Sequence, residues 1–146
     1  MFYGEYRYKL DEKGRLVIPA RFRKILKKRH LIITRGLEKC LFLFVEDDWK
    51  KQEKKLRDLP FTKGNPRAFS RLFFSGASFC IADGQGRITV PLPLLDFAGI
   101  KEKIVLIGVS DRIEIWSEKN WQDYLKSSLS SFEEIAEELV NGKGEK

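Results

Sequence analysis

The chain repeats itself: shifted by 72 residues, the sequence superposes on itself without a gap. Identical residues recur at this offset, including several Gly, Pro and Trp. The matched pairs are Phe2/Phe74, Gly4/Gly76, Asp11/Asp83, Gly14/Gly86, Arg15/Arg87, Pro19/Pro91, Gly36/Gly108, Glu46/Glu118 and Trp49/Trp121. Hydrophobic positions recur as well, as in the pair Leu16 and Ile88. Self-similarity at a fixed spacing indicates a tandem duplication, so the two copies should share one fold.

Each copy predicts the order strand, turn, strand, short helix, strand, turn, strand, helix. In the first copy we expect strands over residues 2–10, 15–19, 31–35 and 40–45, and helices over 20–28 and around Trp49 and Leu56. Four short strands make a marginal domain alone, so the copies should interlock around a pseudo-twofold axis. The expected fold is α+β, a strand-rich pseudo-symmetric barrel with flanking helices.

The repeat also suggests boundaries along the chain. We expect the first copy over residues 1–58, a linker and helix start over 59–72, the second copy over 73–126, and a C-terminal helix and tail over 127–146. Both copies should share one compact domain, because neither is large enough for a core of its own.

Two helices outside the shared pattern have start signals of their own. Asn65 and Pro66 predict an N-cap followed by the first helical residue. Ser131 to Glu134 has the form of a capping box, and Asn141-Gly142 predicts the end of that helix. Phe132, Ile135 and Leu139 form an apolar stripe along it, and such a stripe most often packs on its own domain.

Basic side chains gather in the first copy. Residues 1–60 carry 17 Lys and Arg against 9 Asp and Glu, whereas residues 61–146 carry 11 against 12. Residues 7–29 alone hold ten cations and two anions. Such a cluster favours a polyanionic partner, although a solvated basic face explains the charge equally well.

Several function classes are disfavoured. The longest strongly apolar run, Cys40–Val45, is far shorter than the roughly 20 residues that span a bilayer, and no secretory signal is visible. Cys40 and Cys80 make neither a disulfide framework nor a zinc site, and His30 has no catalytic context. Gly84-Gln85-Gly86 lacks the rest of a dinucleotide fingerprint. We therefore expect a cytoplasmic protein that is not an enzyme, with no metal, cofactor, membrane or small-molecule substrate.

The pattern Asp-x-x-Gly-Arg-x-x-x-Pro occurs at 11–19 and again at 83–91. Gly14 and Gly86 can adopt the positive φ that a tight loop needs. Asp11 and Asp83 can accept hydrogen bonds from loop N–H groups or pair with the arginine four residues on. Turn chemistry explains the aspartates and glycines fully, whereas Arg15 lies in the densest cation cluster of the chain.

These motifs closely resemble the MraZ family of bacteria. The resemblance covers nearly the whole chain and is carried by residues 1–6 (MFYGEY), 10–19 (LDEKGRLVIP), 71–77 (RLFFSGA), 83–87 (DGQGR) and 112–116 (RIEIW). Each half is also similar to the swapped-hairpin module of AbrB/SpoVT-type DNA-binding regulators.

The resemblance implies a sequence-specific transcriptional regulator of the division and cell-wall gene cluster. Such a protein binds short G-rich direct repeats in double-stranded DNA as a ring-shaped homo-oligomer, which implies a cytoplasmic, nucleoid-associated location. The alternative is an RNA-binding or structural ring-forming protein without sequence-specific DNA recognition. A toxin-binding antitoxin is disfavoured, because such proteins usually carry one module.

The family motif maps onto Asp11/Arg15 and Asp83/Arg87, and the AbrB-like pattern adds basic residues on the following helix. We expect loop 11–15 and helix 20–28 of the first copy to form one basic ridge. Its phosphate-neutralising residues would be Lys13, Arg21, Lys24 and Lys27. Arg15, with Arg23 as a second candidate, would read guanine in the major groove.

The second copy lacks this cation cluster. The positions matching Arg21, Arg23, Lys24 and Lys28 are Pro93, Leu95, Asp96 and Ile100. Two roles therefore stay open for Arg87, a DNA contact or a purely structural pairing with Asp83. Two locations also stay possible for Leu95 and Ile100, the hydrophobic core or a contact with another subunit.

Overall fold

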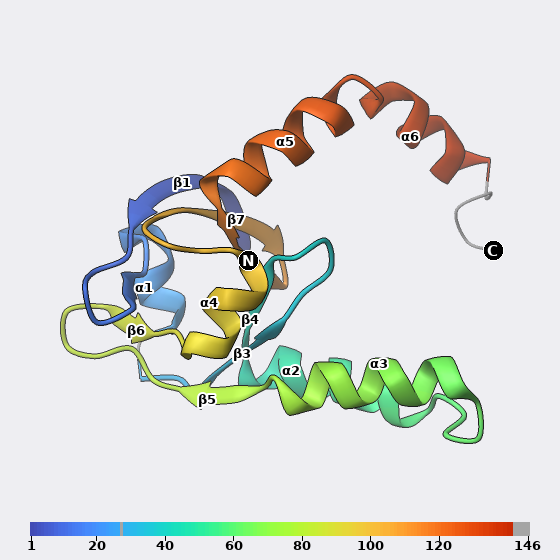
Figure 1. Ribbon diagram of the computed structural model, residues 1–146, viewed down its shortest axis with the longest axis horizontal. Coiled ribbons are helices and arrows are strands. Elements are labelled where there is room, and N and C mark those ends of the chain that lie inside the picture. The colour runs from blue at the N-terminus through green and yellow to red at the C-terminus, as the bar shows by residue number, and fades with distance from the viewer. Residues whose placement is uncertain (27, 142–146) are drawn as a thin grey trace.

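The computed structural model describes residues 1–26 and 28–141 (Figure 1). The first copy comprises β1 (Phe2–Lys9), β2 (Arg15–Val17), α1 (Ala20–Leu26), β3 (Leu31–Arg35), β4 (Leu41–Val45) and α2 (Glu46–Arg57). After α3 (Gly64–Ser75), the second copy comprises β5 (Ser78–Cys80), β6 (Arg87–Thr89), α4 (Leu92–Ala98), β7 (Lys103–Ser110), β8 (Arg112–Ser117) and α5 (Glu118–Leu129). The helix α6 (Phe132–Val140) follows. This order confirms the α+β class and the repeated element pattern.

The two copies exchange strands. Six strands form one antiparallel sheet in the order β1-β7-β8-β4-β3-β5, and β2 and β6 form a separate two-stranded ribbon. The first strand of each copy pairs with the other copy, β1 with β7 and β5 with β3. The sheet order is unchanged when the copies are interchanged, so a pseudo-twofold axis passes between β4 and β8, where Phe42 lies opposite Glu114.

The expected barrel is not confirmed, because within the described residues the large sheet is open. Its edges are β1 and β5, which would have to pair with each other to close it. Instead the chain turns after each of these strands into the β2–β6 ribbon, whose central pair is Leu16 and Ile88. The ribbon therefore forms a second layer over the sheet.

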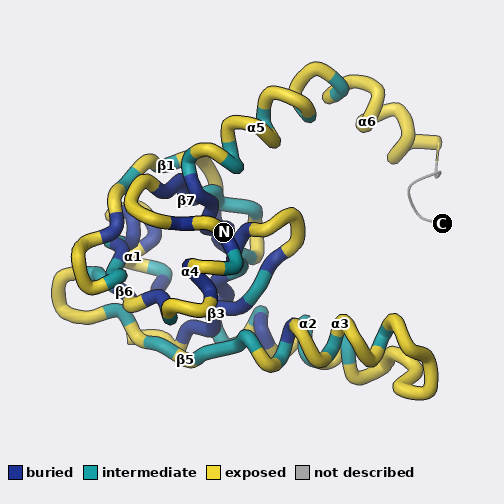
Figure 2. Tube along the Cα trace, viewed as in Figure 1, coloured by how far each residue is buried: buried dark blue, intermediate teal, exposed yellow. Residues whose placement is uncertain are grey.

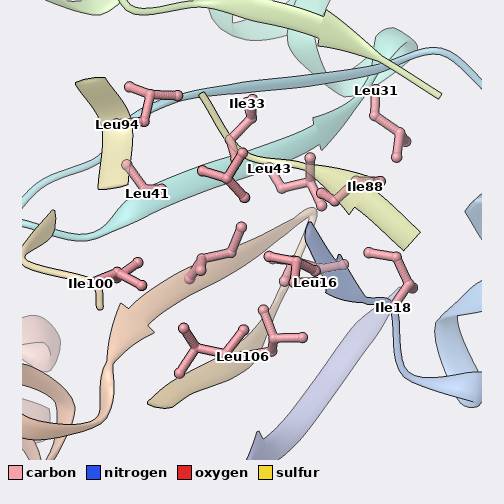
Figure 3. Close-up of a cluster of buried hydrophobic side chains, with 14 of the residues drawn as sticks. Leu16, Ile18, Leu31, Ile33, Leu41, Leu43, Ile88, Leu94, Ile100 and Leu106 are labelled. Atoms are coloured by element: carbon pink, nitrogen blue, oxygen red, sulfur yellow. The ribbon is translucent and has the colours of Figure 1, made fainter. Parts of the chain in front are cut away.

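The main core lies between the ribbon and the sheet. Leu16, Ile18 and Ile88 from the ribbon side meet Leu43 and Leu106 from the sheet, and each of these side chains is at most 1% exposed (Figure 3). Because strand side chains alternate between faces, burial of Leu16 and Ile88 turns the neighbouring ribbon residues outward.

The helices α1 and α4 add to this core through Phe22 and Leu94. Leu95 and Ile100 are buried in it too, at 8% and 5% exposure, which settles their role as core residues. A second cluster joins α2 and α3 to the sheet through Ile32, Phe44, Trp49 and Phe73. Phe42 and Trp121 are only half-buried.

Two helix starts differ from the sequence-based expectation. The N-cap of α3 is Lys63, whose carbonyl accepts from the Arg67 N–H at 3.3 Å, so Asn65 lies inside the first turn and is not the cap. Pro66 is tolerated there, because first-turn N–H groups have no intrahelical partner. Ser131 precedes α6 but its side chain makes no capping hydrogen bond. The expected stop at Gly142 lies outside the described residues.

Two helical arms extend from the body of the protein, the α2–α3 hairpin and the α5–α6 arm (Figure 1). Every residue of α6 is exposed (Figure 2), so its apolar stripe does not follow the usual preference for packing on its own domain within the described residues. None of the described helices is both long and apolar enough to cross a membrane.

Candidate nucleic-acid interface

The loops 11–14 and 83–86 are each organised by one aspartate. Asp11 Oδ1 accepts from the backbone N–H groups of Lys13 and Arg15 at 2.9 Å each, and Asp11 Oδ2 accepts from Arg15 Nε at 2.7 Å. Gly14 closes this loop with φ +72°, a value that side chains disfavour. The first loop is therefore a rigid support for one guanidinium group.

The second loop repeats this arrangement. Asp83 Oδ1 accepts from the backbone of Gln85 and Arg87 at 2.9 Å each, and Asp83 Oδ2 accepts from Arg87 Nε at 2.8 Å. Gly86 has φ +75°. Because the pairing with aspartate is the same in both copies, it does not distinguish a structural Arg87 from a functional Arg15.

Hydrogen bonds keep both carboxylates ionised. The backbone N–H of Arg15 is the main cause that lowers the pKa of Asp11, and the N–H of Arg87 does the same for Asp83. The guanidinium groups of the two arginines lower these pKa values further. Each charged carboxylate fixes the plane of its arginine through Nε.

Arg15 and Arg87 lie on the outer face of the β2–β6 ribbon. Arg15 is opposite Thr89 and Arg87 is opposite Val17, so the two arginines are diagonal neighbours across the pseudo-twofold axis. Both side chains are 26% exposed. Their Nη atoms donate no hydrogen bond to any described residue, so the outer edge of each guanidinium can contact a ligand.

The two loops are tied to each other as well as to the ribbon. The Ile18 N–H donates to the Gly86 carbonyl at 2.7 Å, and the Val90 N–H donates to the Gly14 carbonyl at 3.0 Å. Each copy thus supports the loop of the other.

The basic helix α1 lies beside the second loop. Arg23 Nε donates to the Ile18 carbonyl at 2.9 Å, and it would be only 2.7 Å from a Cβ atom placed on Gly86. Arg23, Lys24 and Lys28 line a pocket of about 430 Å³ together with Asp83, Gly84 and Gly86 of the second loop. The expected ridge of loop 11–15 and helix 20–28 is therefore wrong, because strand exchange brings the helix of one copy to the loop of the other.

The first loop lies beside an apolar residue of α4 and not beside a basic helix. Its neighbour is Leu95 of α4, whose Cδ1 would be 3.6 Å from a Cβ atom on Gly14. Lys13 is exposed on this loop, next to Arg15. The first loop thus carries its own cations, while the second loop obtains them from α1.

The remaining expected site residues are less central. Arg21 is exposed on α1 but does not line the pocket, and Lys27 lies outside the described residues. His30 Nδ1 is 3.5 Å from a Glu46 carboxylate oxygen. Cys40 and Cys80 are both free thiols. Across residues 1–26 and 28–141, no group of three or more His, Cys, Asp or Glu side chains could hold a metal ion.

Comparisons with known proteins agree on one family. A family model described as "MraZ protein, putative antitoxin-like" matches residues 1–72 and again residues 73–142. The transcriptional regulator MraZ of Natranaerobius thermophilus is 51% identical over 141 residues, which cover 97% of this chain and 98% of that protein. Those of Syntrophomonas wolfei and Moorella thermoacetica are 50% and 47% identical, also over 97% of this chain and 98% of theirs.

Proposed function

The chain belongs to the MraZ family of transcriptional regulators, and we propose that it acts by binding duplex DNA through the outer face of the β2–β6 ribbon. The observation that carries this proposal is the pair of arginines Arg15 and Arg87, each held at Nε by a carboxylate, with a side chain that stays 26% exposed. The preferred site is a short G-rich direct repeat upstream of the division and cell-wall gene cluster.

The geometry of the ribbon suits the major groove of B-form DNA, which is wide enough for a two-stranded β-ribbon. A guanidinium edge donates two parallel hydrogen bonds to guanine O6 and N7, and each such contact contributes roughly 1–3 kcal/mol of discrimination. Because the Nε–carboxylate bond already fixes the guanidinium plane, little side-chain entropy is lost on binding. Two arginines across one ribbon favour guanine-containing sites.

Cations around the ribbon provide affinity without sequence preference. Lys13 on the first loop, and Arg21, Arg23 and Lys24 on α1, are exposed. We assign them to phosphate contacts, whose release of counterions makes binding fall steeply with salt. This assignment changes the role expected for Arg23, because Arg23 lies on α1 and not on the ribbon itself.

A single ribbon is a small contact surface, so we propose that the protein works as a ring of identical subunits. Linked ribbons bind successive repeats with a high effective concentration when the spacing of subunits matches the spacing of sites. The protein would then act in the cytoplasm at the nucleoid.

The test is binding of the full chain to labelled nucleic acids over a salt series. A duplex with G-rich direct repeats is compared with a scrambled duplex of equal composition, a single strand and a structured RNA. The proposal predicts the tightest binding to the repeat duplex and a steep loss with salt. Equal affinity for both duplexes, or a preference for RNA, would support the alternative of a ring protein without specific DNA recognition.

A further inference from the structure

The apolar stripe of α6 has no packing partner among the described residues. Phe132, Ile135, Leu139 and Val140 are 68%, 46%, 63% and 87% exposed. They follow the i, i+3, i+7, i+8 spacing of one helix face. Figure 2 shows the helix exposed along its whole length. An apolar face of this kind on the surface marks an interaction site.

The borders of this stripe are acidic. Apart from Ala136, the remaining helix positions are Glu133, Glu134, Glu137 and Glu138, and the α6 segment FEEIAEELV contains no basic residue. A surface that covers α6 should therefore be apolar in its centre and basic at its rim.

The tip of the α2–α3 hairpin has these properties. A groove of about 340 Å³ there is lined by Leu56, Leu59 and Phe61 together with Arg57, Arg67 and Arg71, and no acidic side chain lines it. Phe61 is 79% exposed. Arg67 Nη1 donates to the Phe61 carbonyl at 3.1 Å, which fixes the tip next to the groove.

The repeat explains why α6 lacks a partner. In the first copy α3 follows α2 and folds back on it, with the Trp49 and Phe73 rings stacked at 5.4 Å. In the second copy α6 follows α5, but it extends away as a separate arm (Figure 1). The apolar face of α3 is therefore covered by α2, whereas α6 has no helix folded against it.

We infer that α6 of one subunit docks in the α2–α3 groove of a second copy of the chain. The acidic borders of α6 would face Arg57, Arg67 and Arg71, and its apolar stripe would cover Phe61. Each subunit has one helix and one groove on different surfaces, so the contact is head-to-tail and generates a closed ring or a filament. The inference rests on the proposed function in one respect, namely that the subunits assemble into a ring.

Charge reversal in the full-length chain tests the contact. Arg67→Glu/Arg71→Glu places acid in the groove, and Glu137→Lys/Glu138→Lys places base on α6 in its last turn, where the helix dipole favours lysine. Each double variant should weaken self-association in sedimentation velocity by roughly tenfold or more, and the chain with all four changes should regain most of it. Lys54→Glu/Lys55→Glu, on α2 but outside the groove, is the matched control and should assemble as the original chain does.

Cysteine cross-linking tests whether α6 of a second chain occupies the α2–α3 groove. Phe61→Cys and Ile135→Cys are placed in separate chains, mixed and oxidised. The native thiols compete poorly, because burial raises the pKa of Cys40 and raises that of Cys80 to about 11. A Phe61→Cys/Ile135→Cys dimer in the mixture, absent from either chain alone, supports the inference.

Three results would overturn the inference: a monomer at all concentrations, assembly unchanged by the charge reversals, or no cross-link between the Phe61→Cys chain and the Ile135→Cys chain. Binding to a duplex with a single repeat, measured in parallel, separates this inference from DNA recognition. Variants that lose assembly should keep single-repeat binding, whereas failure of the original chain to bind it would contradict the proposed function alone.

Discussion

Arg23 of the first copy lies against Gly86 of the second, so closely that a Cβ atom at residue 86 would be 2.7 Å from Arg23 Nε. This contact joins the basic helix α1 of one copy to loop 83–86 of the other. It follows from the exchange of strands between the copies, and it brings Arg23 and Lys24 to the second loop.

Gly86→Ala should therefore destabilise the protein by about 1–2 kcal/mol, since an L-residue at this positive φ is strained and its Cβ atom meets Arg23. The measurement is urea unfolding. Gly84→Ala is the matched control in the same loop, because its Cβ atom would meet nothing within 4 Å. Equal stability of the two variants would show that the contact between Arg23 and Gly86 is not tight.

Leu16→Ala should cost about 2–5 kcal/mol of unfolding free energy, because Leu16 is fully buried at the central pair of the ribbon and its removal leaves a cavity. Affinity for the repeat duplex should fall with it, since the ribbon face depends on this anchor. Leu92→Ala, at a position 68% exposed, should stay within about 0.5 kcal/mol of the original chain. A small effect of Leu16→Ala would mean that the ribbon is not held by the core.

Acid should loosen both loops. The pKa values of Asp11 and Asp83 are lowered from 3.8 in the folded chain, chiefly by the backbone N–H groups of Arg15 and Arg87. Their stabilising contribution is therefore complete above the unfolded value and is lost as pH falls through the folded pKa. NMR titration of the carboxyl carbons should give midpoints below 3.8. The Asp11→Asn/Asp83→Asn chain should show a flatter dependence of stability on pH, and midpoints at or above 3.8 would contradict the prediction.

Lys24→Ala should weaken binding to the repeat and scrambled duplexes by the same factor. Lys24 lines the pocket beside the second loop, and we assign it a phosphate contact. The slope of log affinity against log salt should fall in magnitude by about 1. Selective loss on the repeat duplex would instead make Lys24 a base-reading residue.

The sequence predicts the elements of the fold well because the repeat constrains them twice. The pairs β2/β6, α1/α4 and α2/α5 have the same bounds at an offset of 72 residues. The Asp–Gly–Arg motif likewise predicts two equivalent loops, and both form with the same hydrogen bonds.

Contacts between the copies could not be predicted in the same way. Charge along the chain places Arg23 near Arg15, whereas strand exchange places it against Gly86. The openness of the sheet also depends on long-range strand pairing. β1 and β5 each pair with one strand and form the two edges of the sheet. Local capping signals at Asn65 and Ser131 fail because α3 begins earlier and Ser131 is not extended, with φ −109° and ψ 12°.

We propose that Arg15 and Arg87 together read guanine from one ribbon. The most direct measurement is the ratio of affinities for the repeat and scrambled duplexes, at one salt concentration, for the original chain, Arg15→Ala and Arg87→Ala. Each variant should lose roughly 1–3 kcal/mol of discrimination, while its binding to the scrambled duplex should change little. The proposal is contradicted if either variant weakens both duplexes equally, or if Arg87→Ala leaves discrimination intact.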